Sequence, residues 1–164
     1  MSKESEREPG QDASLRIILD TSLLVSLRRG DPAAQNALRE RREKAEEVGI
    51  SRLTEYELLL GANFLWKKYN DARESAWLDE ALDWLVIYEV DGDVVRTAAE
   101  VQAEALTRGK PLPEMDLLVA LSAKSGSELL TLDADQLKMR EVLKSRGVTV
   151  EAPRASSIGG TEHG

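Results

Sequence analysis

The chain has 164 residues and a mass of 18.1 kDa, a size that fits one domain with one hydrophobic core. It carries 22 Lys and Arg against 30 Asp and Glu, a net charge of −8, which argues against broad, nonspecific adhesion to nucleic acid or to an anionic membrane. It contains no cysteine, and its one histidine is His163 near the C-terminus. These absences exclude a disulfide framework, a thiolate zinc site and mechanisms that need a cysteine nucleophile or a histidine base.

Both ends of the chain are polar. Residues 1–14 lack the apolar core of a secretory signal, and no later apolar run approaches the length that spans a bilayer. We therefore expect a cytoplasmic protein with no membrane partner. The composition predicts a polar N-terminal tail at 1–14, an ordered domain at 15–153 and a flexible C-terminal tail at 154–164.

Short aliphatic or β-branched runs alternate along the chain with longer segments of helical period. The runs RIIL, VGIS, LVIYEV, ELLTL and VTVEA predict about five strands. Capping and stop signals predict helices between them, at about 21–28, 32–47, 54–69, 72–85, 94–108, 114–125 and 134–146. Strands that alternate with helices form parallel sheets covered on both faces. The sequence therefore predicts a single α/β domain with an approximately five-stranded parallel sheet flanked by helices on both faces.

Five carboxylates stand where strand-like runs pass into helical segments. They are Asp20, Glu57, Asp116, Asp133 and Asp135. The carboxyl ends of parallel strands share one edge of the sheet, where ligands bind. Carboxylates that meet there repel one another unless cations intervene, and hard oxygen ligands suit Mg²⁺ or Mn²⁺. The pattern therefore indicates a metal-dependent phosphodiester enzyme.

Each of these acids also has a purely structural interpretation. Asp20 is a candidate N-cap, and Thr54 with Glu57 matches the T-x-x-E capping box. Asp133 with Gln136 nearly matches the same box.

Asp116 and Asp135 fall in first helical turns, where the helix dipole favours a negative side chain by roughly 0.3–1 kcal/mol. Capping explains an acid at one helix start, but it does not require an acid at every strand-to-helix junction. A shared metal site explains all five together, along with the small hydroxyl side chains beside them, Thr21, Ser22 and Thr131.

Four segments resemble the motifs of PIN-domain nucleases, a family that includes the VapC-type toxins of toxin–antitoxin pairs. IILDTSLLVSLRRGD resembles the first motif, and ISRLTEYELLLGA resembles the second, with Glu57 at the acid position. GKPLPEMDLLVALSAK resembles the third motif, with Asp116 at its acid. ELLTLDADQL resembles the fourth, with Thr131 at the hydroxyl position and Asp133 at the last acid. The resemblance runs from about residue 17 to 137 with the motifs in family order.

This resemblance implies a Rossmann-like PIN fold and a Mg²⁺- or Mn²⁺-dependent endoribonuclease that hydrolyses RNA by metal-activated water. It implies either the toxin of a toxin–antitoxin pair, with an antitoxin protein as partner, or a solitary RNA-processing nuclease. The implied catalytic metal ligands are Asp20, Glu57, Asp116 and Asp133, with Asp135 as an auxiliary ligand. Three hydroxyls would orient the carboxylates or ligated waters: Thr21, Ser22 and Thr131.

Basic and aromatic residues are less specific. Four basic residues flank the acids in sequence and are either phosphate contacts or solvated helix ends: Arg28, Arg29, Arg108 and Lys110. Large apolar and aromatic residues gather in the helices between 32 and 85, which indicates core packing or a subunit interface. We expect a homodimer.

Two other enzyme classes fit poorly. A dinucleotide-binding domain needs a glycine fingerprint after the first strand, and ILDTSLLVS has none. A haloacid-dehalogenase-type phosphatase needs a second acid where Ser22 stands. The remaining alternative is a non-catalytic PIN-fold module that binds RNA or a protein.

Overall fold

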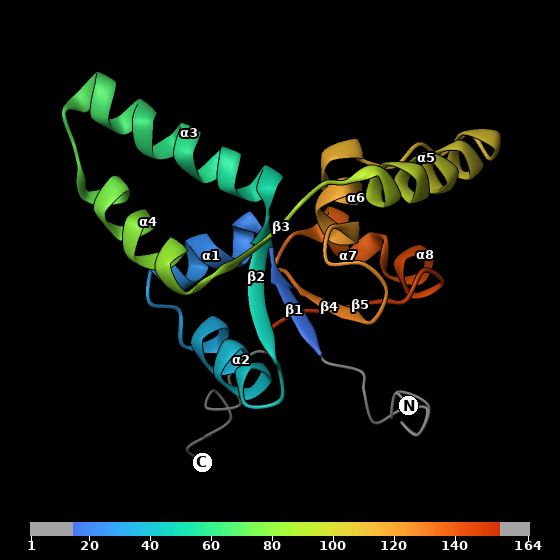
Figure 1. Ribbon diagram of the computed structural model, residues 1–164, viewed down its shortest axis with the longest axis horizontal. Helices are drawn as coiled ribbons and strands as arrows, with labels where there is room; N and C mark the ends of the chain where they lie inside the picture. Colours follow the sequence, from blue (N-terminus) through green and yellow to red (C-terminus); the bar gives the residue numbers. More distant parts are fainter. Residues whose placement is uncertain (1–14, 155–164) are drawn as a thin grey trace, which may run out of the picture.

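The computed structural model describes residues 15–154, which fold around one five-stranded sheet (Figure 1). The strands are β1 (Arg16–Leu19), β2 (Glu47–Ser51), β3 (Val86–Tyr88), β4 (Ser127–Leu130) and β5 (Val148–Glu151). The helices of the described residues are α1 (Thr21–Arg28), α2 (Pro32–Arg42), α3 (Arg52–Tyr69), α4 (Arg73–Trp84), α5 (Gly92–Thr107), α6 (Glu114–Leu121), α7 (Ala134–Lys138) and α8 (Arg140–Lys144). Apart from Arg154, the predicted tails lie outside the described residues.

All strand pairs are parallel, and their order across the sheet is β3-β2-β1-β4-β5. In the central strand β1, Ile17 pairs with Val48 of β2 on one side and with Glu128 of β4 on the other. The chain runs outward from β1 to β2 and β3 and then crosses to β4, so the strand order reverses beside β1. In open α/β sheets, ligands commonly bind at such a reversal, outside the carboxyl ends of the strands.

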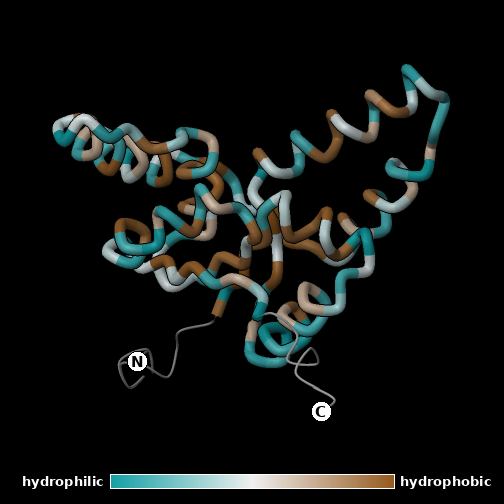
Figure 2. The backbone as a smooth tube through the Cα atoms, turned by 180° about the vertical axis from the view of Figure 1, so that it is seen from behind, coloured by the Kyte–Doolittle hydropathy of each residue, from teal (hydrophilic) through white to brown (hydrophobic). Residues whose placement is uncertain are grey.

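Alternation along the strands sends apolar side chains to both faces of the sheet. Ile17 and Leu19 pack with side chains of α1, α2 and α4, whereas Ile18 packs with side chains of α5, α6 and α8. Figure 2 shows that the central strands are mostly hydrophobic, whereas the outer helices mix polar and apolar residues. The predicted α/β fold, with five parallel strands and helices on both faces, is confirmed.

Two predicted helices end early, and a third is divided. The helix predicted at 114–125 ends at Leu121. The helix predicted at 32–47 ends at Arg42, because Glu47 already belongs to β2 and the intervening residues return the chain to the sheet. The helix predicted at 134–146 is divided at Met139, whose φ of −87° and ψ of 4° lie outside the helical range. Met139 is buried against the sheet, so packing of its side chain accompanies this break.

α3 and α4 extend from the sheet as a pair of helices (Figure 1). Asn70 ends α3 in a left-handed conformation with φ of 53°, a common helix stop. At the other end, α3 begins directly after β2, just as α1 follows β1 and α7 follows β4. The starts of α1, α3 and α7 therefore share the carboxyl edge of the sheet. No helix within residues 15–154 combines the length and apolarity needed to cross a bilayer.

Candidate active site

Asp20 lies at the centre of this edge. It follows the buried strand β1 and is the N-cap of α1, with Oδ1 accepting from the backbone N of Leu23 over 3.1 Å and from Oγ of Ser22 over 2.6 Å. Its other oxygen accepts a hydrogen bond from the hydroxyl of Thr131. Asp20 is only 5% exposed, and burial raises the pKa of its carboxyl above the ordinary value. A capping role is therefore confirmed, but it occupies one oxygen of a carboxylate whose other oxygen contacts Thr131, just after β4.

The loop after β4 joins Asp20 to the acids of α7. Thr131 is fully buried, and its hydroxyl accepts a hydrogen bond from the backbone N of Asp133 over 2.9 Å while it donates to Asp20. Ser22 reinforces the junction, because its Oγ accepts from the backbone N of Leu132 over 3.0 Å. The two hydroxyls thus fix the start of α7 against the start of α1.

Glu57 reaches the same edge from α3. Its carboxylate accepts a hydrogen bond from Oγ1 of Thr21 over 3.1 Å. The Thr54–Glu57 capping box is not formed, because Ser51 is the N-cap of α3 and accepts from the backbone N of Leu53 over 3.2 Å. Since α3 begins at Arg52, Glu57 lies beyond the first turn, and helix capping does not explain its presence.

Asp116 lies in the first turn of α6, and all four other carboxylates act on it electrostatically. Its pKa is raised from 3.8 to about 6, first by burial and then by repulsion from four other carboxylates. Those four are Asp133, Asp135, Asp20 and Glu57. The other four predicted carboxylates are therefore close enough to Asp116 to act on it electrostatically, and Asp133 also acts on Asp20.

The cluster lacks neutralising side chains in the described part of the chain. None of its five members forms an ion pair within residues 15–154. Within the same residues, no three acidic or histidine side chains are arranged as a ready-made metal cage. The available donors are carboxylate and hydroxyl oxygens only, the set that fits a hard divalent cation. Such a cation would both offset the repulsion and draw the carboxylates together.

The four predicted basic contacts lie at helix ends. Arg28 pairs with Glu74 over 3.3 Å and lies 5.7 Å from the ring centre of Trp77, and Arg29 is the exposed C-cap of α1. Arg108 pairs with Glu104 over 2.9 Å at the C-terminal end of α5, and Lys110 follows in the next loop. None of the four contacts the five carboxylates through a hydrogen bond or ion pair between described residues.

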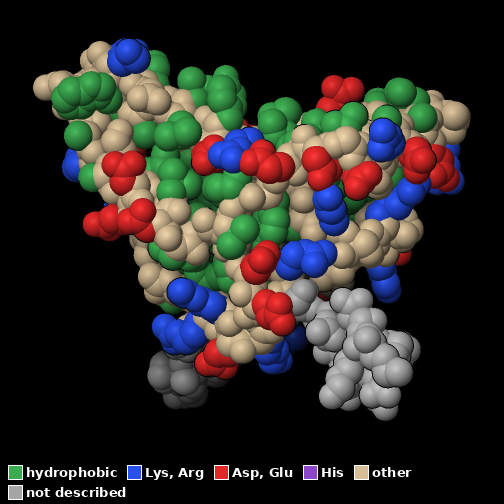
Figure 3. Space-filling model, in the orientation of Figure 1, with side chains coloured by type: hydrophobic (Ala, Val, Ile, Leu, Met, Phe, Trp, Pro, Cys, Tyr) green, Lys and Arg blue, Asp and Glu red, His purple; other side chains and the backbone are tan. Residues whose placement is uncertain are grey.

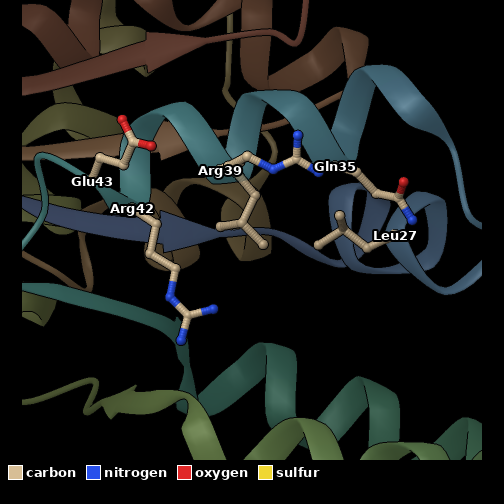
Figure 4. Close-up of a pocket in the computed structure, with 6 residues that line it drawn as sticks. Leu27, Gln35, Arg39, Arg42 and Glu43 are labelled. Atoms are coloured by element: carbon tan, nitrogen blue, oxygen red, sulfur yellow. The ribbon is translucent and has the colours of Figure 1, made fainter.

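A separate pocket of about 370 Å³ lies beside α2 (Figure 4) and contains none of the five acids. It is lined by Leu27, Gln35, Leu38, Arg39, Arg42 and Glu43. The guanidinium of Arg42 lies 5.2 Å from the ring centre of Trp84. This pocket belongs to the packing of α2 against its neighbours and not to the carboxylate edge.

Sequence reasoning missed the contacts of two residues in the helices that carry the acids, Arg52 and Gln136. Arg52, the first residue of α3, pairs with Glu55 over 2.6 Å and with Glu89. Gln136 appears in the sequence only as part of an imperfect capping box, yet its side chain donates to the backbone oxygen of Asp116 over 2.9 Å. Asp133 instead caps α7 by accepting from the backbone N of Asp135 over 2.8 Å. No local sequence signal indicates the contact between Gln136 and Asp116, because its partners are twenty residues apart.

Solved structures with a similar fold come from bacterial VapBC systems. A chain of VapBC2 from Rickettsia felis, bound to a DNA fragment from its promoter, is 20% identical with a TM-score of 0.66, over 84% of this chain and 98% of that one. A chain of DNA-bound VapBC from Salmonella typhimurium is 21% identical with a TM-score of 0.65, over 85% and 99%. VapBC-5 from Mycobacterium tuberculosis is 22% identical with a TM-score of 0.59, over 85% and 98%. At these identities the likeness establishes the fold alone.

Sequence comparison gives the family directly. No curated protein sequence matches this chain significantly. The family model described as PIN domain matches residues 17–142, a range that includes all five carboxylates and the three hydroxyls beside them. The chain therefore belongs to the PIN-domain family, which the resemblance of its four acidic motifs predicts.

Proposed function

We propose that this protein is a Mg²⁺- or Mn²⁺-dependent endoribonuclease that hydrolyses RNA phosphodiester bonds. The observation that carries the proposal is the convergence of five carboxylates at one edge of the sheet, where Asp20, Asp133 and Glu57 are joined to neighbouring hydroxyls and all four other acids raise the pKa of the partly buried Asp116. PIN domains are generally nucleases. A site with this much negative charge repels a phosphodiester unless cations offset the charge. Metal-dependent hydrolysis of a phosphodiester fits both the family and this need for a cation.

Asp20, Glu57, Asp116 and Asp133 are the proposed metal ligands and catalytic residues, with Asp135 as an auxiliary ligand. The chemistry that a divalent ion supplies in such a site is activation of water and neutralisation of charge on the leaving oxygen. The chain itself holds the ligands in place: the Thr131 hydroxyl binds Asp20 and that of Thr21 binds Glu57. No cysteine exists and no histidine lies in residues 15–154, so water is the proposed nucleophile.

The test is cleavage of a single-stranded RNA by the purified protein. We expect cleavage with Mg²⁺ or Mn²⁺ and none with EDTA, and a DNA oligonucleotide of the same sequence serves as the substrate control. Equal cleavage in EDTA and in Mn²⁺ would contradict a metal-dependent mechanism. Binding of RNA without cleavage under all conditions would favour a non-catalytic module.

An antitoxin is the proposed protein partner. The structure of VapBC-5 from Mycobacterium tuberculosis is described as a member of a family of toxin–antitoxin systems, and this chain shares its fold. We infer that a segment of the antitoxin covers the carboxylate edge and places an arginine or lysine where the cation binds. Isolation of a stable complex after co-expression with the product of the neighbouring reading frame supports this role, and failure to form one favours a solitary nuclease.

A second copy of the chain is the other proposed partner. Large apolar side chains of α3 remain exposed in the single chain, including Leu60 at 55% and Phe64 at 53%. With Tyr56, they recur every four residues and so form one stripe along the helix. Figure 3 shows hydrophobic side chains gathered over α3 and α4. Because a monomer rarely leaves so large a patch in water, we propose that α3 contributes to a homodimer interface.

A further inference from the structure

Gln136 is the side chain through which α7 reaches α6. It is 1% exposed, and its Nε2 donates a hydrogen bond over 2.9 Å to the backbone oxygen of Asp116. Within residues 15–154, no other side-chain hydrogen bond joins these two helices. α6 carries Asp116, while α7 begins after Asp133 and carries Asp135. This one amide therefore links the two elements that supply three of the five acids.

The amide oxygen of Gln136 makes no contact with a described residue that explains a glutamine at this position. Oε1 of Gln136 is buried and has no hydrogen-bond partner in the described part of the chain. A buried acceptor without a partner is unfavourable, whereas an apolar side chain of similar volume would avoid that loss. Core packing alone therefore favours methionine or leucine at this position. The feature that distinguishes glutamine from them is its N–H donor to Asp116.

A restraint is needed at this point because the acids repel one another. Burial, Asp133 and Asp135 are the three strongest influences that raise the pKa of Asp116. Two of these influences come from the α7 side, so repulsion acts to separate α7 from α6. The hydrogen bond of Gln136 opposes that separation.

We propose that Gln136 is a positioning residue that fixes Asp116 relative to Asp133 and Asp135 and thereby sets how tightly the site holds a divalent cation. This inference rests on the proposed function, since it presumes that the carboxylates bind a metal. Partners that orient metal ligands typically change metal affinity by 10–100-fold when they are removed. The backbone oxygen of Asp116 lies within α6. Loss of the glutamine side chain therefore mainly changes the position of Asp116 relative to α7 and does not leave that oxygen without a helical partner.

The test measures Mn²⁺ binding to the full-length protein by calorimetry in the absence of RNA, together with thermal melts. Gln136→Met keeps the volume and removes the donor, whereas Gln136→Asn keeps the amide but is one methylene too short to reach Asp116. Tyr88→Phe is the matched control, because it removes one side-chain hydrogen bond, to Glu47 over 3.2 Å, away from the acids. We expect both Gln136 variants to raise the Kd for Mn²⁺ by about 10-fold or more, while Tyr88→Phe leaves it unchanged.

Several results would overturn the inference. If both Gln136 variants bind Mn²⁺ with the wild-type Kd but melt at a lower temperature, Gln136 has a purely structural role. The same conclusion follows if Tyr88→Phe loses as much Mn²⁺ affinity as the Gln136 variants. If Gln136→Met does not fold, Gln136→Asn carries the comparison, and failure of both to fold also assigns a structural role. Absence of Mn²⁺ binding by the wild type would overturn the proposed function together with this inference, which separates that failure from one confined to Gln136.

Discussion

Replacing Asp116 with asparagine removes a charge that the fold holds unfavourably. The pKa of this carboxyl is raised from 3.8 to about 6, which corresponds to at most about 3 kcal/mol at neutral pH. Because the side chain is partly open to water, screening reduces the effective figure to about 1–2 kcal/mol. We therefore expect the metal-free Asp116→Asn protein to be more stable than the wild type by that amount, or by roughly 3–6 °C in Tm.

This gain in stability should depend on pH. The pKa of Asp116 is higher in the folded than in the unfolded state, so the folded state binds more protons between about pH 4 and pH 6. The contribution of protonated Asp116 to the free energy of unfolding of the wild type is therefore fully present below about pH 4 and is lost as the pH rises through 6. Asparagine does not titrate. The difference between the two proteins should be near zero at about pH 4 and should reach its full value above about pH 6.

Thermal melts in EDTA across this range, repeated with Mn²⁺ at neutral pH, measure both effects. Glu114→Gln is the control, because Glu114 is an exposed acid in the same first turn of α6, and its loss should cost about 0.3–1 kcal/mol. Mn²⁺ at a hundred times its Kd should stabilise the wild type by about 2.7 kcal/mol, and Asp116→Asn should show a smaller increment. If Asp116→Asn in EDTA melts below the wild type at neutral pH, as the control should, then Asp116 is only a favourable helix-start charge and the reasoning is refuted.

Three further predictions concern the support and the partners of the site. Thr131→Val removes the hydroxyl that binds both Asp20 and Asp133, so urea unfolding should show a loss of about 1–3 kcal/mol; unchanged stability would contradict these bonds. Light scattering at micromolar concentration should give about twice the chain mass for the wild type and the monomer mass for a Leu60→Glu, Phe64→Glu variant; a monomeric wild type defeats the proposed interface. A complex with the antitoxin should bind Mn²⁺ more weakly than the free protein in calorimetry; equal affinity would show that no antitoxin cation occupies the site.

The sequence pattern predicts the sheet well, because each strand is a short apolar run and each crossover is a helix with its own start and stop signals. The predicted helix ends are less accurate where tertiary packing, and not the local sequence, decides where the helix stops. Arg42 ends α2 because the chain must turn into β2, and the pattern that continues to residue 47 carries no sign of this. The break at Met139 accompanies its packing against the sheet, which helical periodicity alone does not reveal.

Four of the acids are predictable because Asp20, Asp133 and Asp135 follow strands that share one edge and Glu57 lies in the helix after a third strand. Asp116 lies in a helix that follows α5 and not a strand, so only its motif points to it. Their supporting bonds are harder to predict. The hydroxyl of Thr131 meets Asp20 from a segment 111 residues away, and family resemblance, not local pattern, points to it. Ser51, and not the T-x-x-E box, caps α3, since two competing caps stand three residues apart and only the backbone path after β2 selects between them. Gln136 carries no local signal because its partner is a backbone oxygen on another helix.

The most direct test of metal-dependent catalysis compares two aspartates that do the same structural work. Asp20 and Asp31 are the N-caps of α1 and α2, accepting from backbone N atoms over 3.1 Å in each case, but only Asp20 contributes to the raised pKa of Asp116. Asparagine is as good an N-cap as aspartate, so each Asp→Asn change keeps the cap. Each change removes the charge and one acceptor oxygen, which takes a hydrogen bond from Thr131 in Asp20 and from Ser26 in Asp31, so the two variants are matched. At saturating Mn²⁺, RNA cleavage should fall by at least about two orders of magnitude in Asp20→Asn and should stay at the wild-type rate in Asp31→Asn. Wild-type cleavage by Asp20→Asn, or an equal loss in both variants, would contradict catalysis by this carboxylate cluster.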